Sequence, residues 1–339
     1  FNGSKESGMV IVPTELITDN GSKLESIVLE LAHRNDLDYH FIEWLENHNK
    51  FCNSLVDRIV PGKPNATDTK KIETALGYED DLLTMSEVFR LWAIEGDEKV
   101  KNILSFSKAD PALIITPDIT LFKELKLRLL NGTHTFNCGT AFLSGFDITR
   151  QAMLDPVYGH FTKELMHTEI AAAIPFTIDK KVKEDFANYT FERFCNPFID
   201  HQWQSITVQY TSKMKMRNLP LLQRHYELGH SVPLHMAAGF AAFLLYMKVT
   251  KKAGNKFFGQ RKDEEYEIKD DAAEYFYTVW STGNGDKVAA EVMGNEELWE
   301  TDLTKLPGFL QAVQELLQDF TIHGVLNTIK QKKKKKATA

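Results

Sequence analysis

The pattern of apolar residues changes near Pro117, and this change constrains the fold more than any other feature of the chain. Before this point, short apolar runs typical of buried strands, Met9–Pro13 and Ala112–Thr116, alternate with amphipathic helical segments. After it, long helical patterns follow one another with little strand signal. Because alternating strands and helices favour a parallel sheet, the sequence predicts an α/β region at residues 1–117 followed by an all-helical domain at 118–330.

Charge restricts the partners of the chain. Its 339 residues carry a formal net charge of −7, so no broad basic surface is expected and nucleic acid is excluded as a partner. The exception is the lysine run Lys332–Lys336 close to the end of the sequence. A run of like charges is typical of a solvated segment, so the sequence predicts a disordered tail at residues 331–339.

Apolar run length and cysteine spacing restrict the compartment. The longest apolar run, Pro233–Met247, is shorter than the ~20 residues that span a bilayer, so it predicts a buried helix and no membrane partner. Cys52, Cys138 and Cys195 lie far apart and form no CxxC pair. This usage indicates free thiols in a reducing, cytoplasmic compartment.

The stretch LKLRLLNGTHT, residues 125–135, places three polar side chains on a helical face that is otherwise apolar. At about 100° per residue, His134 and Asn131 lie roughly 80° and 140° from Lys126. Gly132 costs roughly 1 kcal/mol against alanine inside a helix, and it is easier to explain if another backbone or a ligand comes close. One interpretation is a functional site; the other is a solvated lysine beside a core histidine.

Three stretches together resemble one family: IVPTELITDNG (11–21), FCNSLVDRIVPG (51–62) and KLRLLNGTHT (126–135). In this order they resemble the long-chain, polyol-specific dehydrogenases, a family that includes mannitol dehydrogenase and the hexuronate reductases. The turn at Pro13–Ile17 and the later block RFCNPFIDHQ (193–202) are similar to the hexuronate-reductase branch. The resemblance covers essentially the whole chain.

The resemblance implies the C-terminal part of a Rossmann-like nucleotide domain followed by a helical substrate domain. Family members begin with a half-domain that carries a glycine-rich phosphate turn, but no GxGxxG follows a strand here. We therefore expect the chain to start after that half. The implied cofactor is NAD, with NADP left open because the residues that read the ribose would lie upstream.

The implied reaction is hydride transfer between the nicotinamide and a secondary alcohol or ketone, without a metal. Lys126 matches the lysine that the family uses as acid and base. A free lysine has a pKa of about 10.4, and placement in a closed apolar cleft would lower it. By the same resemblance, Asn131 would donate a hydrogen bond to the oxygen that gains charge, and His134 would bind a substrate hydroxyl.

The resemblance also assigns the loop that contains Val56, Asp57 and Arg58 to the nicotinamide end of the cofactor. The alternative is a structural Asp57–Arg58 pair that fixes the loop. One departure concerns Leu16, which occupies the position of a second oxyanion-hole asparagine in mannitol dehydrogenases. Leucine cannot donate a hydrogen bond, which favours a substrate other than mannitol.

A uronate carries a carboxylate, so its site is expected to contain a cation. The candidates are Arg193, His201 and Lys213, with Arg217 as a fourth. The predicted substrate is therefore a small sugar acid, a keto-hexuronate or its aldonate. The alternatives are a related uronate or mannitol as substrate, and a non-catalytic helical interaction domain.

The histidines of the helical region indicate no metal site. His225, His230 and His235 recur every five residues, which spreads them around a helix instead of placing them on one face. His167–Glu169 does not form an HExxH motif.

Overall fold

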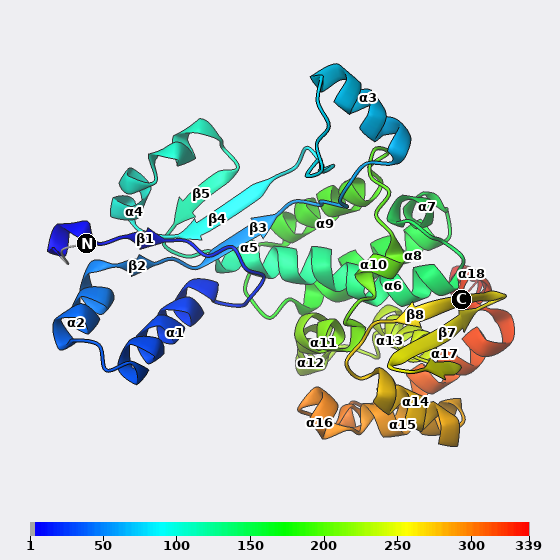
Figure 1. Cartoon of the computed structure of the whole chain (residues 1–339). Helices are drawn as coiled ribbons and strands as arrows, with labels where there is room; N and C mark the ends of the chain where they lie inside the picture. Colours follow the sequence, from blue (N-terminus) through cyan, green and yellow to red (C-terminus); the bar gives the residue numbers. More distant parts are fainter. Residues whose placement is uncertain (1–3, 339) are drawn as a thin grey trace. The chain divides into compact units, whose positions relative to one another are not determined.

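The chain forms two compact units, residues 1–123 and 124–339 (Figure 1). The computed structural model describes residues 4–338, and describes side chains as far as residue 333. The division follows Lys123, a few residues after the boundary predicted at 117. Each unit has its own elements and core.

The first unit alternates short strands with helices. Its strands are β1 (Val10–Ile11), β2 (Lys50–Phe51), β3 (Ser54–Asp57), β4 (Leu91–Glu95) and β5 (Leu113–Thr116). Its helices are α1 (Asn20–Arg34), α2 (Tyr39–His48), α3 (Ala66–Leu76) and α4 (Glu98–Ile103), and α5 (Thr120–Glu124) leads out of the unit. The two strands expected from short apolar runs are present as β1 and β5.

The strands form two small sheets. β1 pairs with β2 in parallel, and β4 pairs with β5 in parallel with Trp92 opposite Leu113. β3 pairs with β4 in the antiparallel direction, so the prediction of a parallel sheet is wrong for this pair. The reason is the connection between them: Gly62 forms a further antiparallel bridge with Met85, so the chain returns directly instead of crossing over the sheet.

The start of α1 is fixed by a buried asparagine and a close approach. The side-chain amide of Asn20 donates to the carbonyl oxygens of Pro13 (3.0 Å), Glu15 (3.1 Å) and Ser54 (3.2 Å). A Cβ at Gly21 would lie 2.4 Å from the main-chain carbon of Cys52, so only glycine fits there. These two residues join the first helix to the strands.

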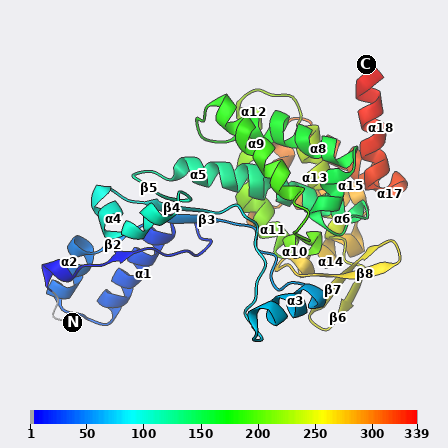
Figure 2. The same ribbon diagram turned by 90° about the horizontal axis from the view of Figure 1, so that it is seen from above.

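The second unit is mainly helical. Its α-helices are α6 (Thr133–Leu143), α7 (Thr149–Leu154), α8 (Tyr158–Glu164), α9 (Lys180–Phe194), α10 (Trp203–Ile206), α11 (Tyr210–Lys213), α12 (Leu219–Glu227), α13 (Leu234–Tyr246), α14 (Ala273–Thr282), α15 (Gly285–Met293), α16 (Glu296–Trp299), α17 (Phe309–His323) and α18 (Val325–Thr338). The apolar run at 233–247 forms the buried helix α13, as predicted. It packs against α6 and α17 (Figure 2). A Cβ at Gly239 would lie 2.7 Å from the Phe136 ring, so glycine allows this close approach.

Three segments in the described part of this unit are π-helical: η3 (Leu125–Gly132), η4 (Leu165–Ile170) and η6 (Met214–Asn218). A π-helix bonds residue i to i+5 and is frequent at functional sites. The 100° spacing used for residues 125–135 therefore does not hold over η3. This is a correction to the predicted geometry of that helix, although not to its being helical.

The second unit also contains a small antiparallel sheet that the sequence analysis did not predict. Its strands are β6 (Lys251–Ala253), β7 (Lys256–Arg261) and β8 (Glu264–Ile268). Gly254 and Lys262 have positive φ angles of 60° and 53° in the two tight turns. Most side chains of β6 and β8 are charged, which hides the alternation that normally indicates a strand.

The lysine run continues helix α18 to Thr338, where the sequence predicted a disordered tail. Lysine is a good helix former, and the start of α18 is held by the buried side chains of Val325 and Ile329. No helix within the described part of the chain combines the length and the apolar character needed to cross a membrane.

Candidate functional site

The π-helical segment η3 carries the first two predicted catalytic residues. Lys126 and Asn131 are five residues apart, and i→i+5 bonding places them about one turn from each other. Lys126 is only 8% exposed, and Asn131 is half-buried. The glycine that ends η3 is explained by a close approach. A Cβ at Gly132 would lie 3.3 Å from Asn218 Oδ1, and the Asn218 amide donates to the Gly132 carbonyl over 3.3 Å.

A buried arginine, which the sequence analysis missed, joins η3 to η6. Arg128 Nε donates to Glu124 Oε2 over 3.0 Å, and both side chains are buried. Arg128 Nη1 donates to the carbonyl oxygens of Met216 (3.2 Å) and Arg217 (2.8 Å). The four-residue spacing of Glu124 and Arg128 is the sequence signal for this pair. Arg128 therefore links the segment of Lys126 to the segment of Arg217.

The third predicted catalytic residue, His134, lies in the first turn of α6 among aromatic rings. Its ring centroid is 4.1 Å from Phe194, 5.3 Å from His201 and 5.8 Å from Trp203. Burial, followed by the electrostatic influence of His201 and Arg217, holds the pKa of His134 well below its usual value. His134 is therefore a neutral imidazole, with one nitrogen that donates and one that accepts.

The predicted carboxylate-binding cations surround this histidine. Arg193, His201, Lys213 and Arg217 all act on the charge of His134, so α9, α11, η6 and the loop before α10 bring them together. Burial, and then Lys213, lowers the pKa of His201 to about 4. Burial followed by Arg217 lowers the pKa of Lys213, and burial lowers the pKa of Arg217.

Several nitrogens of this group have no hydrogen-bond partner among the residues that the structure describes. They are both ring nitrogens of His134, Nδ1 of His201, Nε1 of Trp203 and Nε of Arg217. The indole and guanidinium nitrogens can only donate, whereas a neutral imidazole both donates and accepts. Unmatched polar atoms in a buried site call for an explanation, and a ligand is one. The group therefore suits a ligand with several acceptor oxygens and at least one hydroxyl donor.

Two cations of the group are already anchored through other atoms. Lys213 Nζ donates to the carbonyl oxygen of Ile206 over 3.0 Å, and Arg217 Nη1 donates to Thr135 Oγ1 over 3.3 Å. These hydrogen bonds hold the two cations in place before any ligand arrives.

Trp203 is a residue of the group that sequence reasoning missed, although it lies two positions after His201.

The predicted cofactor residues Val56, Asp57 and Arg58 line one hollow of the first unit, with a volume of about 430 Å³. Arg58 Nε donates to the carbonyl oxygen of Glu87 over 2.9 Å, which fixes the loop after β3. Trp92 lines the same hollow, and its indole Nε1 has no hydrogen-bond partner among the described residues.

Comparison with known proteins identifies the family. The profile of the mannitol dehydrogenase C-terminal domain matches residues 118–321, and that of the mannitol dehydrogenase Rossmann domain matches residues 1–108. The chain belongs to the mannitol dehydrogenase family. The predicted fold class, an α/β region followed by a helical one, is confirmed by these matches.

Relatives of this chain are named altronate oxidoreductases. The chain is 35% identical over 335 residues to altronate oxidoreductase of Bacillus subtilis (strain 168), covering 98% of this chain and 66% of the relative. It is 33% identical over 337 residues to altronate oxidoreductase of Shigella flexneri, covering 97% and 67%. The chain thus spans about two thirds of the length of these relatives.

Solved structures of the family share the fold. Mannitol 2-dehydrogenase of Pseudomonas fluorescens, in a ternary complex with NAD and D-mannitol, superposes with a TM-score of 0.74 at 23% identity, covering 96% of this chain and 62% of that one. A substrate-free D-sorbitol dehydrogenase superposes with a TM-score of 0.67 at 20% identity, covering 94% and 62%. Leu16, where the sequence was expected to depart from mannitol dehydrogenases, lies in the loop before α1 and is 76% exposed.

The described residues contain no group of three or more His, Cys, Asp or Glu side chains arranged to hold a metal ion. Two of the three regularly spaced histidines have separate partners. His225 Nε2 contacts the Ser231 carbonyl at 2.7 Å, and His235 contacts Glu169.

Proposed function

We propose that this chain acts in an NAD-dependent oxidoreductase that interconverts a keto-hexuronate and its aldonate, namely tagaturonate and altronate. The observation that carries the proposal is the buried cationic group around His134, in which Arg217 and Trp203 present donors without acceptors. The altronate oxidoreductase relatives, at 35% and 33% identity, support the same substrate.

The substrate carboxylate is assigned to the cations. A guanidinium fork matches a carboxylate better than any other side chain, and Arg217 has an unmatched Nε for it. Lys213, His201 and Arg193 add positive charge or donors around the same histidine. A neutral polyol has hydroxyl oxygens but no charge, so it would leave this positive potential uncompensated.

The proton is assigned to Lys126. When an alcohol is oxidised, Nζ accepts the hydroxyl proton; when a ketone is reduced, the same nitrogen returns it. Lys126 is only 8% exposed, so its side chain lies in a site from which water is largely excluded. Asn131, about one π-turn away, donates to the oxygen that gains charge, and no metal takes part in this scheme.

His134 is assigned to a substrate hydroxyl. A neutral imidazole can accept a hydrogen bond from a substrate hydroxyl at one nitrogen and donate a hydrogen bond from the other. Both nitrogens lack partners in the described residues. A core histidine would normally be satisfied by a backbone carbonyl. The unsatisfied ring therefore favours the substrate role.

The hollow of the first unit suits the nicotinamide end of NAD. Trp92 offers an indole N–H without an acceptor, and Val56, Asp57 and Arg58 line the same space. When bound, the nicotinamide supplies or accepts the hydride. Val56 and Asp57 at the end of β3, with Arg58 in the loop after it, would hold and orient it.

The test measures NADH oxidation by the full-length protein with tagaturonate, fructuronate and fructose side by side, together with calorimetric binding of altronate. We expect tagaturonate to turn over fastest and altronate to bind. Turnover of fructuronate or fructose instead would move the proposal to a related uronate or to mannitol chemistry. Failure to bind both NADH and altronate would favour a non-catalytic helical interaction domain.

The Arg217→Gln variant tests the carboxylate assignment within the same assay. Because a hydrogen bond to a charged group contributes about 1.5–3 kcal/mol, KM for tagaturonate should rise by roughly tenfold or more. KM for fructose, which has no carboxylate, should change little. Equal increases for both substrates would remove Arg217 from the carboxylate site.

A further inference from the structure

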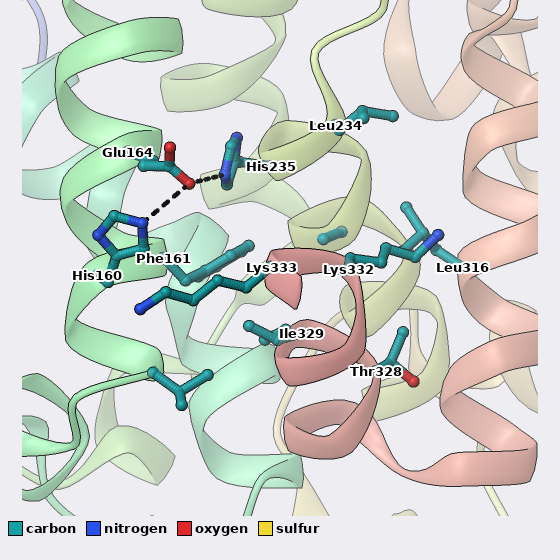
Figure 3. Close-up of a pocket in the computed structure, with 12 residues that line it drawn as sticks. His160, Phe161, Glu164, Leu234, His235, Leu316, Thr328, Ile329, Lys332 and Lys333 are labelled. Carbon is teal, nitrogen blue, oxygen red and sulfur yellow. Dashed lines mark hydrogen bonds and ion pairs between the residues drawn. The ribbon is translucent and has the colours of Figure 1, made fainter. Parts of the chain in front are cut away.

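The helical unit contains a hollow of its own, separate from the hollow of the first unit. None of the residues that line it has been assigned a role above. It lies among α8, α13, α17 and α18 and has a volume of about 390 Å³ (Figure 3). Pockets for small molecules measure about 300–1,000 Å³, so this one has room for a small organic ligand.

The walls of this pocket are apolar. Val157 directly precedes α8, Phe161 lies in α8, and further apolar wall residues are Ala238 of α13, Leu316 of α17 and Ile329 of α18. An apolar surface of this kind is stabilised when an apolar ligand displaces water from it. The walls therefore select a hydrocarbon or aromatic body over a sugar.

One end of the pocket is polar, and its carboxylates already have partners. Glu164 Oε2 lies 3.3 Å from His235 Nε2 and 3.5 Å from His160 Nε2 (Figure 3). Glu169 contacts His235 Nδ1 at 2.6 Å and accepts from the amides of His235 (2.9 Å) and Met236 (2.8 Å) at the start of α13. Burial lowers the pKa of His235, but Glu169 and then Glu164 outweigh it, so the pKa is raised and its positive charge is favoured.

Helix α18 contributes two lysines to the pocket, and only one of them has an acidic partner. Lys332 Nζ lies 3.4 Å from Asp319, whereas Lys333 forms no ion pair with any residue that the structure describes. Figure 3 shows the Lys333 side chain reaching across the pocket toward His160, while Lys332 turns toward Leu316. The charge left without a counter-ion at the pocket is therefore positive.

We propose that this pocket binds a small amphiphilic carboxylate, with its apolar body against Val157, Phe161 and Ile329 and its carboxylate facing Lys333 and His160. A cationic amphiphile would meet Lys333 and find both glutamates occupied. A sugar acid would leave its hydroxyls against hydrocarbon walls, where unpaired polar groups are costly. The ligand therefore differs in class from the substrate of the cationic group around His134.

The test is calorimetric titration of the full chain with octanoate, octanol and octylammonium. These probes share one apolar body and differ in charge. We expect octanoate to bind about fivefold more tightly than octanol, because one exposed charge pair contributes up to about 1 kcal/mol. Octylammonium should bind more weakly than either.

Four variants separate the effect of the charge from that of the cavity. Lys333→Gln should remove the preference for octanoate over octanol, while Lys330→Gln, an exposed lysine of the same helix outside the pocket, should leave it unchanged. Val157→Phe should fill the pocket and weaken octanoate and octanol alike by at least about tenfold. Ala238→Leu fills it from α13 and replaces Val157→Phe if that variant melts at a lower temperature.

Three results would overturn the proposal. They are no binding of octanoate at millimolar concentration, binding that both filling variants leave intact, and binding of octylammonium tighter than that of octanoate. None of these titrations uses NADH or a sugar acid, so the outcome is independent of the proposed oxidoreductase activity.

Discussion

At the scale of single residues, the proposed proton-transfer role and the proposed charge-recognition role fall on different side chains. Lys126 is buried in η3, while the cations that face His134 come from later elements. The consequence is that the two roles can be removed one at a time. Each has its own measurable effect.

Lys126→Ala should lower turnover of tagaturonate by about 10²–10⁴-fold, the range typical of a lost general acid or base. Altronate binding should change by only a few-fold, because the carboxylate cations remain. The control is Lys215→Ala, which removes a lysine paired with Glu300 at 2.8 Å in the neighbouring segment η6. Turnover retained within a few-fold in Lys126→Ala would rule out the acid–base assignment.

His201 should make the fold less stable in mild acid. Its folded pKa is about 4, against an ordinary value of 6.5, so the unfolded chain takes up the proton first as pH falls. The stability of the fold associated with a neutral His201 is fully present above about pH 6.5 and is lost as pH falls toward about 4. In His201→Asn, the drop in unfolding free energy between pH 7 and pH 5 should be smaller by about 1–2 kcal/mol. Denaturant titrations at the two pH values measure this, and equal drops in both proteins would contradict it.

At the scale of elements, the site depends on two π-helical segments held together by side chains. Arg128 of η3 bonds to two carbonyls of η6, and Asn218 of η6 bonds back to Gly132. These contacts fix Lys126 and Arg217 relative to each other within the unit. The hydrogen bonds between the two segments therefore position Lys126 and Arg217 for the proposed reaction.

Arg128→Lys should keep the charge opposite Glu124 but lose the fork that reaches both carbonyls. Because Arg217 would shift, we expect kcat/KM for tagaturonate to fall by about tenfold and that for fructose to fall less. Arg224→Lys is the matched control, since Arg224 forms only an exposed pair with Glu227. A loss of melting temperature without a change in the ratio of the two substrates would make Arg128 purely structural.

The elements also show how far sequence reasoning reaches. Short β-branched runs predicted β1 and β5, and the apolar run predicted α13, because in these segments local pattern and burial agree. The π-helical bonding of η3 was not predictable, since its contacts with Arg128 and Asn218 join residues far apart in sequence. Strands β6 and β8 were missed because lysine and glutamate dominate them. Among the residues of the candidate site, the family motifs pointed to Lys126, Asn131 and His134. Arg128 and Trp203 could be recognised only from the three-dimensional structure.

At the scale of the whole molecule, the predicted roles divide between the two units. The cofactor residues line a hollow of the first unit, and the substrate residues gather in the second. A ligand stabilises the structure to which it binds, by about 2.7 kcal/mol at one hundred times its Kd. A substrate analogue should therefore slow the hydrogen exchange of backbone amides mainly in the unit to which it binds.

Altronate should protect backbone amides of the second unit from hydrogen exchange, most strongly in α6, η6 and the end of α9 around His134. Amides of residues 10–57 should change less, because the cationic group lies wholly in the other unit. Altritol, which keeps the hydroxyls and lacks the carboxylate, is the control and should protect far less. Protection strongest in the first unit would place the sugar acid elsewhere. Equal protection by altritol would show that hydroxyls, not the cations around His134, select the ligand.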